Sequence, residues 1–432
     1  MKNQNIIASL ATATVTVLGT GLSEAQLGEA DLLGTDFKGS LLYYTESDRV
    51  TAIEAIIEGQ YRLSQIDTLG VKLVVDSLTG ASASGAVASD FDQTFTTPSG
   101  NGTYVTRAGE TPLDTSFLDT RYSLSPTWTR QWDANYETVL GANISKEYDY
   151  FSLSANALVN YTTNDRNRTY SAGFTIAQDS IDPEGGLPIA FGIMRNQGGL
   201  QPRLTGDEDK TTLDLLLGLT QVIDEKSLFQ INYSLSSSDG YHSDPYKFLS
   251  VIGADGRPVI EDPPATGLSR VLYENRPDSR LKHSIFAKYK RDFSGDVLDA
   301  SYRFMFDDWG INSHTLDLKY KFRINDTSYL QPHLRYYMQS EADFYQPFII
   351  SGSEPVAGDT ATFASADYRL GELSGFTAGL EYGRDNVDRP WSIAVEYYLQ
   401  SLGTVDRQFG ELLNQDLSED VSAIMLKFNM DF

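Results

Sequence analysis

The chain has 432 residues, no cysteine and a formal net charge of −25, with 25 tyrosines and 21 phenylalanines. The lack of cysteine excludes a disulfide framework and a thiolate metal site, and the acidic excess argues against a nucleic-acid partner, whose phosphates require lysine and arginine. Beyond the N-terminus, no stretch approaches the roughly 18 to 20 apolar residues of a transmembrane helix, which excludes a helical membrane protein.

Residues 1–25 have the layout of a secretory signal peptide. Lys2 supplies the positive start, and an apolar run interrupted only by small residues extends from Ile6 to Leu18. Small residues at Ser23 and Ala25 match the positions that a signal peptidase reads, which makes Gln26 the expected start of the mature chain. The alternative is a buried N-terminal helix. The sequence therefore predicts an exported protein whose residues 26–432 form a single domain.

From residue 38 onward, short segments alternate between apolar and polar residues. The clearest one sets Leu316, Leu318, Tyr320 and Phe322 against Asp317, Lys319, Lys321 and Arg323. A strand with this period of two has one apolar and one polar face and separates an oily medium from a wet one. Because lipid offers the backbone no hydrogen-bond partners, only a closed sheet survives in it. More than a dozen such strands predict an all-β, antiparallel, up-and-down transmembrane barrel.

The predicted strands are sixteen, an even number because both chain ends are expected on the periplasmic side. Fourteen and eighteen strands remain alternatives, as does a soluble β-sandwich or a β-helix. Five long connections, expected at the extracellular end, are 79–114, 181–208, 239–277, 342–371 and 404–418. The segment Ala361–Leu370 also alternates, and we assign it to the fourth of these loops as a hairpin arm. The strands are 37–46, 50–63, 66–78, 115–132, 135–147, 150–163, 167–180, 209–222, 225–237, 279–291, 295–307, 312–324, 327–341, 372–383, 389–401 and 420–432.

The last strand carries the strongest sign of location. Its apolar face ends on the C-terminal Phe432, and its polar face includes Lys427. It resembles the closing strand of outer-membrane barrels of Gram-negative bacteria, in which a terminal aromatic residue is an assembly signal. The resemblance implies recognition of Phe432 by the barrel assembly machinery, and contact with outer-membrane lipid and lipopolysaccharide.

Several local motifs carry a second resemblance. They are Thr79–Ser82, Tyr246–Ser250, Leu272–Ser284, Tyr302–Gly310, Ser313–Leu318 and Ser365–Gly371. Together they resemble an uncharacterised family of Gram-negative outer-membrane proteins, known as a domain of unknown function. The resemblance implies a fold and a location but no established activity. Members of that family often sit beside genes for a small lipoprotein and a flavin-transferase, which implies a redox role.

Charged residues on the polar faces are candidates for the lining of a pore. If the apolar faces point outward, the polar faces of the strands between 279 and 341 carry mainly lysine and arginine into the barrel. Such a basic inner wall attracts anions. The alternative is that any water-filled barrel needs a polar lining, in which opposite charges pair. The candidates are Lys282, Lys288, Lys290, Asp299, Arg303, Asp317, Lys319, Lys321, Arg323, Arg335, Glu396 and Lys427.

The remaining motifs do not indicate a catalytic or ligand-binding site. The histidines lack the spacing of a metal site, although His333 is expected to point inward. Asp255-Gly256 predicts a hairpin turn inside the loop 239–277, and Trp309 is expected to anchor a turn at the membrane interface. We therefore expect no catalytic, metal or cofactor site. The leading hypothesis is a porin-like, anion-leaning channel. The alternatives are a scaffold that docks a small lipoprotein or redox partner, and a hydrolase with Ser, His and Asp from different strands.

Overall fold

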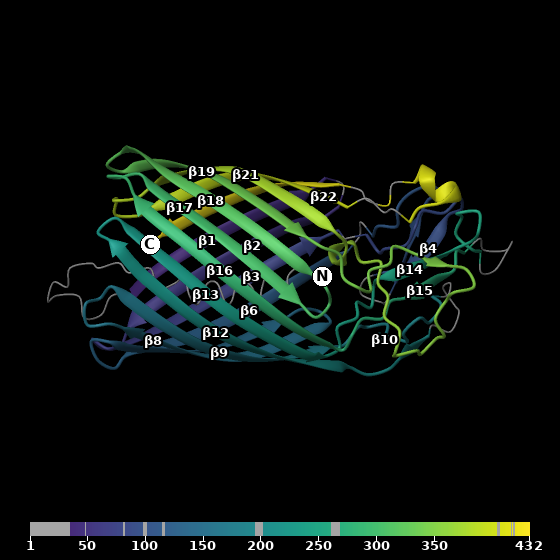
Figure 1. Cartoon of the computed structure of the whole chain (residues 1–432), viewed down its shortest axis with the longest axis horizontal. Helices are drawn as coiled ribbons and strands as arrows, with labels where there is room; N and C mark the ends of the chain where they lie inside the picture. Colours follow the sequence, from purple (N-terminus) through teal and green to yellow (C-terminus); the bar gives the residue numbers. More distant parts are fainter. Residues whose placement is uncertain are drawn as a thin grey trace.

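The computed structural model describes residues 35–47, 49–80, 83–97, 102–114, 117–194, 202–260, 268–403, 407–415, 417 and 420–432. The predicted signal peptide, residues 1–25, lies outside them. Sixteen of the described strands close into one antiparallel barrel, in which each strand pairs with the barrel strands before and after it, and β1 pairs with β23 (Figure 1). They are β1 (Thr35–Glu46), β2 (Thr51–Arg62), β3 (Asp67–Thr79), β6 (Leu118–Gln131), β7 (Tyr136–Lys146), β8 (Tyr150–Thr162), β9 (Arg168–Ile181), β12 (Glu208–Asp224), β13 (Ser227–Gly240), β16 (Ser279–Asp292), β17 (Val297–Asp307), β18 (Asn312–Asn325), β19 (Ser328–Gln339), β21 (Leu373–Arg384), β22 (Trp391–Leu402) and β23 (Val421–Asp431).

The predicted transmembrane barrel is confirmed, strand by strand. Every predicted segment coincides with one barrel strand, and only the ends differ. The segment 115–132 corresponds to β6, which starts at Leu118, and the segment 209–222 corresponds to β12, which extends to Asp224. Strand ends are weakly encoded because the alternation of residues continues into the turns.

The apolar face of each strand is the outer surface of the barrel. On β18, Leu316, Leu318 and Phe322 are all exposed, although they are large and apolar. The residues between them, such as Asp317 and Lys319, face the inside, which we call the lumen. A continuous exposed apolar belt around a closed sheet is the surface that lipid covers in a transmembrane barrel.

The two ends of the barrel differ in their connections. Short turns join the strands at the end where the C-terminus lies, on the left of Figure 1. At the other end, the five long connections span residues 80–117, 182–207, 241–278, 340–372 and 403–420, with short turns between them at 47–50, 147–149 and 308–311. This is the predicted asymmetry of short turns at one end and long loops at the other.

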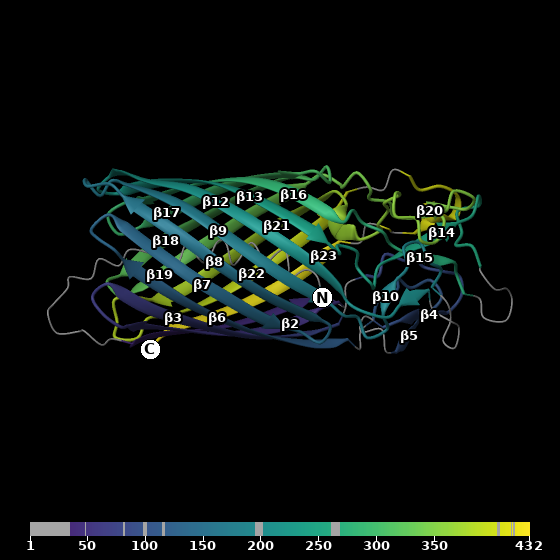
Figure 2. The ribbon, with the colours of Figure 1, turned by 90° about the horizontal axis from the view of Figure 1, so that it is seen from below.

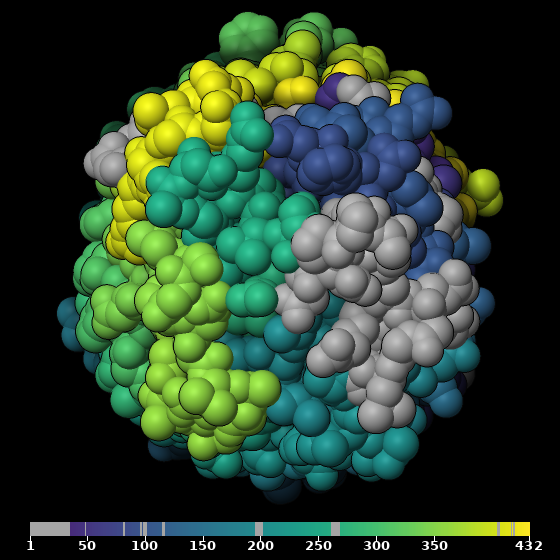
Figure 3. Space-filling model, turned by 90° about the vertical axis from the view of Figure 1, so that its right-hand side faces the viewer, coloured from purple at the N-terminus to yellow at the C-terminus, as the bar shows by residue number. Residues whose placement is uncertain are grey.

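The five long loops fold together into a cap over one end of the barrel. Figures 1 and 2, a quarter turn apart, show it beyond the strand ends, and Figure 3 shows the loops meeting across that end. Among the described residues, no helix is long and apolar enough to cross a membrane. The cap elements are β4 (Gln93–Thr96), β5 (Thr103–Thr106), β10 (Leu187–Pro188), β11 (Arg203–Leu204), β14 (Phe248–Ile252), β15 (Val271–Tyr273), β20 (Ile349–Ile350), η1 (Tyr368–Leu370) and η2 (Gly410–Asn414).

The cap has a hydrophobic core of its own, centred on β14. Every residue of β14 is buried, and the strand pairs antiparallel with β15 and parallel with β20. Phe248 packs with Phe95 and Met194, which come from two other loops, and Ile252 packs with Leu412 from a third. Because apolar side chains from several loops are buried together, the loops form one folded body.

The predicted turn at Asp255-Gly256 is present and joins two cap loops. The Gly253 amide donates to the Arg257 carbonyl at 2.8 Å. Gly256 has a φ of 82°, and a Cβ there would lie 2.4 Å from the Phe409 carbonyl oxygen. The turn therefore needs glycine both for its backbone conformation and for its close approach to the loop 403–420.

Two details of the cap differ from the expectations. The segment Ala361–Leu370 lies in the expected loop but forms no hairpin arm, since Ala364 bridges to Asn275 and residues 368–370 form η1. Trp309 does not anchor the barrel at the membrane surface. It is only 4% exposed and packs against Phe344 of the cap. In both places contacts from a distant loop override the local pattern.

Candidate functional site

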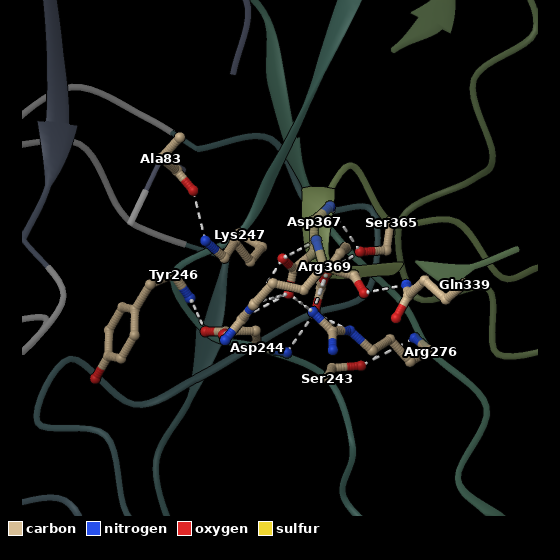
Figure 4. A network of polar contacts seen from close by, with 11 residues as sticks. Ala83, Ser243, Asp244, Tyr246, Lys247, Arg276, Gln339, Ser365, Asp367 and Arg369 are labelled. Carbon is tan, nitrogen blue, oxygen red and sulfur yellow. Dashed lines mark hydrogen bonds and ion pairs between the residues drawn. The ribbon is translucent and has the colours of Figure 1, made fainter. Parts of the chain in front are cut away.

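Six charged side chains meet inside the cap, drawn from two loops that are far apart in the sequence (Figure 4). We call them the cap ion cluster. They come from the loop 241–278, which follows β13, and from the loop 340–372, which follows β19. The members are Asp244, Lys247, Glu274, Arg276, Asp367 and Arg369.

Two arginines hold the cluster together. Arg276 donates through Nη2 to Glu274 at 3.0 Å and to Asp367 at 2.8 Å. Arg369 donates through Nε to the two oxygens of Asp367 at 2.7 and 2.9 Å, and through Nη2 to Asp244 at 3.1 Å. Asp367 thus receives an arginine from each loop. Charge-assisted bonds of this kind are the strong ones among protein hydrogen bonds.

The cluster contains three acids and three bases, so its formal charges cancel. Burial raises the pKa of Glu274. Burial acts in the same direction on Asp367, but the positive charges of Arg369, Lys247 and Arg276 outweigh it and hold the pKa of Asp367 well below its usual value. Burial also lowers the pKa of Lys247. Removal of any one member would leave an uncompensated buried charge.

The cluster and its neighbour Tyr246 also reach two further connections around the mouth of the barrel. The Lys247 ammonium donates to the carbonyl of Ala83 in the loop 80–117. The neighbouring Tyr246 hydroxyl donates to Asp149, in the turn between β7 and β8, at 2.6 Å. The side chains of the cluster and its neighbour therefore tie four connections to one another over the lumen.

The sequence pattern did not predict the cap ion cluster, although most of its members lie in distinctive motifs. Five members lie in the motifs Tyr246–Ser250, Leu272–Ser284 and Ser365–Gly371, which carry the family resemblance. The available signal was the presence of several acidic and basic residues in these motifs. Which acid faces which base depends on how the loops fold, and local sequence does not encode it.

The structure places all the predicted pore-lining residues on the inner face of the barrel, opposite the exposed apolar residues. They lie on six strands. These are Lys282, Lys288 and Lys290 on β16, Asp299 and Arg303 on β17, Asp317, Lys319, Lys321 and Arg323 on β18, Arg335 on β19, Glu396 on β22, and Lys427 on β23.

Part of the basic wall is neutralised by acids. Lys288 pairs with Asp299 at 2.8 Å. Lys321 and Arg323 both pair with Asp385, which lies just after β21 and was absent from the candidates. The alternative that opposite charges pair inside a wet barrel therefore holds for these residues.

A hydrogen-bonded row crosses five strands of the inner wall. We call Asp317, His333, Glu396 and Lys427 the luminal row. His333 contacts Asp317 through Nε2 at 2.9 Å and Glu396 through Nδ1 at 3.0 Å. Lys427 donates to the other oxygen of Glu396 at 2.8 Å. His333 points inward, as predicted, but its two carboxylate partners could not be assigned from sequence.

The other histidines give no support to the hydrolase alternative. His283 and His314 face outward and contact the hydroxyls of Tyr233 and Tyr302 at 2.8 and 2.6 Å. His242 contacts Ser238, but its Nδ1 lies 2.8 Å from the carbonyl of Gly240, where a triad has a carboxylate. In the part of the chain that the structure describes, no group of three potential ligands could hold a metal ion.

The barrel is similar in outline to several solved structures. A ferric enterobactin receptor (PfeA) mutant from Pseudomonas aeruginosa has a TM-score of 0.42 and 9% identity, covering 85% of this chain and 53% of that chain. The siderophore receptor PirA from Acinetobacter baumannii has a TM-score of 0.41 and 8% identity, covering 90% and 57%. A bacterial polysaccharide outer membrane secretin has a TM-score of 0.43 and 6% identity, covering 92% and 97%.

This chain spans about half the length of the two receptors. With TM-scores below 0.5, these likenesses say nothing about its solute or partner. None of the curated proteins matches the sequence. One family model matches residues 7–432, nearly the whole chain, and the chain belongs to that family, described as "Protein of unknown function (DUF3570)".

Proposed function

We propose that this protein is an outer-membrane channel or transporter for a small solute, closed at its extracellular end by the folded cap. The observation that carries the proposal is the charged inner wall. Charges such as those of Lys319 and Arg335 require water around them, so the lumen is expected to be wet. The surplus of inward lysine and arginine between β16 and β19 favours anionic solutes.

The outer membrane of a Gram-negative bacterium is the proposed location. The exposed apolar belt suits lipid, and the long loops stand opposite the end that holds the C-terminus, which suits an extracellular cap and periplasmic turns. Phe432 lies on the apolar face of the closing strand and is 63% exposed, which supports the proposed recognition by the barrel assembly machinery. Export by the signal peptide of residues 1–25 belongs to the same proposal.

The cap is the proposed gate. Its buried β14 and its ion cluster favour a closed resting state, so solute passage requires the cap to move. The experiment is single-channel recording of the refolded full-length protein in a planar bilayer, beside Arg276→Gln. The expected result is rare opening for the native protein and frequent opening for the variant, because Arg276 joins two cap loops. Glu341→Gln, on the cap surface, is the control and is expected to behave as the native protein.

A second candidate is a scaffold that docks a small lipoprotein or redox partner. A cap with its own hydrophobic core favours it, because a porin that is always open needs no such body. The two candidates differ in the same experiment. If Arg276→Gln opens the cap, as measured by hydrogen exchange of β14, and still passes no current, the channel proposal is wrong and the scaffold is favoured.

A further inference from the structure

Two adjacent cations of the inner wall form no close ion pair among the described residues. Lys319 and Arg335 both face the lumen, on the adjacent strands β18 and β19. In the described part of the chain, neither has a carboxylate oxygen within 4.0 Å. They are diagonal neighbours in the ladder, because Lys319 pairs with His333 and Arg335 with Asp317. Diagonal pairs lie about 7 Å apart, so two side chains of this length can reach one small anion.

Both cations lie directly opposite an acid, and both acids are turned away. Lys319 faces Asp299 across the ladder of β17 and β18, but the carboxylate of Asp299 lies 2.8 Å from Lys288 on the far side. Arg335 faces Asp317, but the carboxylate of Asp317 lies 2.9 Å from His333. If the charged residues only made the inner wall hydrophilic, opposite charges that face each other on neighbouring strands would be expected to pair. Here a second base forms the close contact with each acid, Lys288 with Asp299 and His333 with Asp317.

His333 is the residue that keeps Arg335 unpaired. It is buried, and each of its ring nitrogens contacts a carboxylate oxygen. This arrangement suits the imidazolium, which donates a hydrogen bond from both nitrogens. Glu396 reaches it across β21 only because Gly379 stands between them, where a Cβ would lie 2.5 Å from the Glu396 Cγ. The luminal row thus balances its own charges, and Asp317 forms its close contact with His333, while Lys319 and Arg335 act on it only through their charge.

We propose that Lys319 and Arg335 form a luminal binding site for a small oxyanion, of the phosphate or carboxylate class, and that His333 is a positioning residue for it. The guanidinium offers a planar pair of donors and the ammonium a mobile charge, the combination that binds oxyanions. Arg303 of β17 lies close enough to Arg335 for the two like charges to act on each other. The inference rests on the proposed channel function, since the anion must reach the lumen.

The experiment is equilibrium dialysis of radiolabelled inorganic phosphate against the refolded full-length protein in detergent. Lys319→Gln and Arg335→Gln are each expected to weaken binding about tenfold, the loss of one charge-assisted hydrogen bond. Lys321→Gln removes the same charge from the inner wall at a residue that is already paired, and its partner Asp385 keeps Arg323 as a second base. It is the matched control and is expected to change binding much less.

The role of His333 has its own test. His333→Gln removes neither of the two binding cations. It is nevertheless expected to weaken phosphate binding, because Asp317 loses its partner His333 and can then pair with Arg335. The double variant His333→Gln/Asp317→Asn is expected to restore binding, which a merely structural defect would not allow.

Equal phosphate binding by the native protein and by the double variant Lys319→Gln/Arg335→Gln would overturn the inference, even if the protein conducts. Phosphate binding that depends on both cations, in a protein that never conducts with its cap open, would support the site and refute the channel.

Discussion

Asp367→Asn tests whether the cap ion cluster holds the cap closed. Asp367 is 1% exposed and accepts hydrogen bonds from Arg369 and Arg276. An asparagine there keeps the shape but removes the charge. The cluster then holds two acids and three bases, so one positive charge stays buried and uncompensated.

The magnitude follows from the kind of interaction. Breaking a buried ion pair by removing one partner costs about 3–5 kcal/mol. The barrel should keep its stability, because each barrel strand keeps its ladders with both neighbours. The cost therefore falls on the closed state of the cap, and the open population is expected to rise about a hundredfold or more.

The assay is hydrogen exchange of β14, residues 248–252, in detergent micelles. The native protein is expected to protect these buried amides strongly, and Asp367→Asn to exchange them about a hundredfold faster or more. Glu341→Gln is the control, since the Glu341–Arg407 pair is 3.3 Å long with side chains 47% and 58% exposed. Such a surface pair contributes about 0–1 kcal/mol. Unchanged protection of β14 in Asp367→Asn would refute the role of the cluster.

Three further predictions concern the barrel and its rim. Gly379→Ala pushes Glu396 away from His333 and is expected to lower the apparent melting temperature in detergent, at an overpacking cost of about 1–3 kcal/mol; an unchanged melting temperature would show that Glu396 adapts. Burial raises the pKa of Glu147, after β7, from 4.5 to about 7. The folded protein therefore favours the protonated acid. The contribution of Glu147 to the free energy of unfolding is complete below pH 4.5 and is lost as the pH rises through 7. Glu147→Gln should remove about 3 kcal/mol of this pH dependence. Deletion of Phe432 is expected to reduce the heat-modifiable barrel in outer-membrane fractions without preventing refolding in detergent; normal assembly in cells would contradict a signal at this residue.

The barrel could be read from the sequence because each of its strands separates lipid from water. That requirement produces an alternation of apolar and polar residues in the strands. In Leu316–Arg323, apolar and charged residues alternate without exception. The alternation also predicts which side chains point inward, and the candidates from Lys282 to Lys427 lie on the inner face of the barrel.

The cap could not be read in the same way. Its strands are only two to five residues long, and β14 is buried on both faces, so it shows no alternation. Its parallel partner β20 lies about a hundred residues further along the chain. Trp309 shows the same limit, since only the position of Phe344 explains why it is buried and not at the membrane surface.

The sequence by itself determined the antiparallel barrel, the direction of its strand faces and the family resemblance, and it favoured sixteen strands. Only the tertiary structure decided which charges meet. The pairing of Asp317 with His333 and not with the facing Arg335, and the meeting of Arg276 with Asp367, depend on distances between side chains from separate strands and loops. The physical reason is that solvation by lipid or water acts on each residue locally, whereas charge pairing depends on a partner that the fold alone brings near.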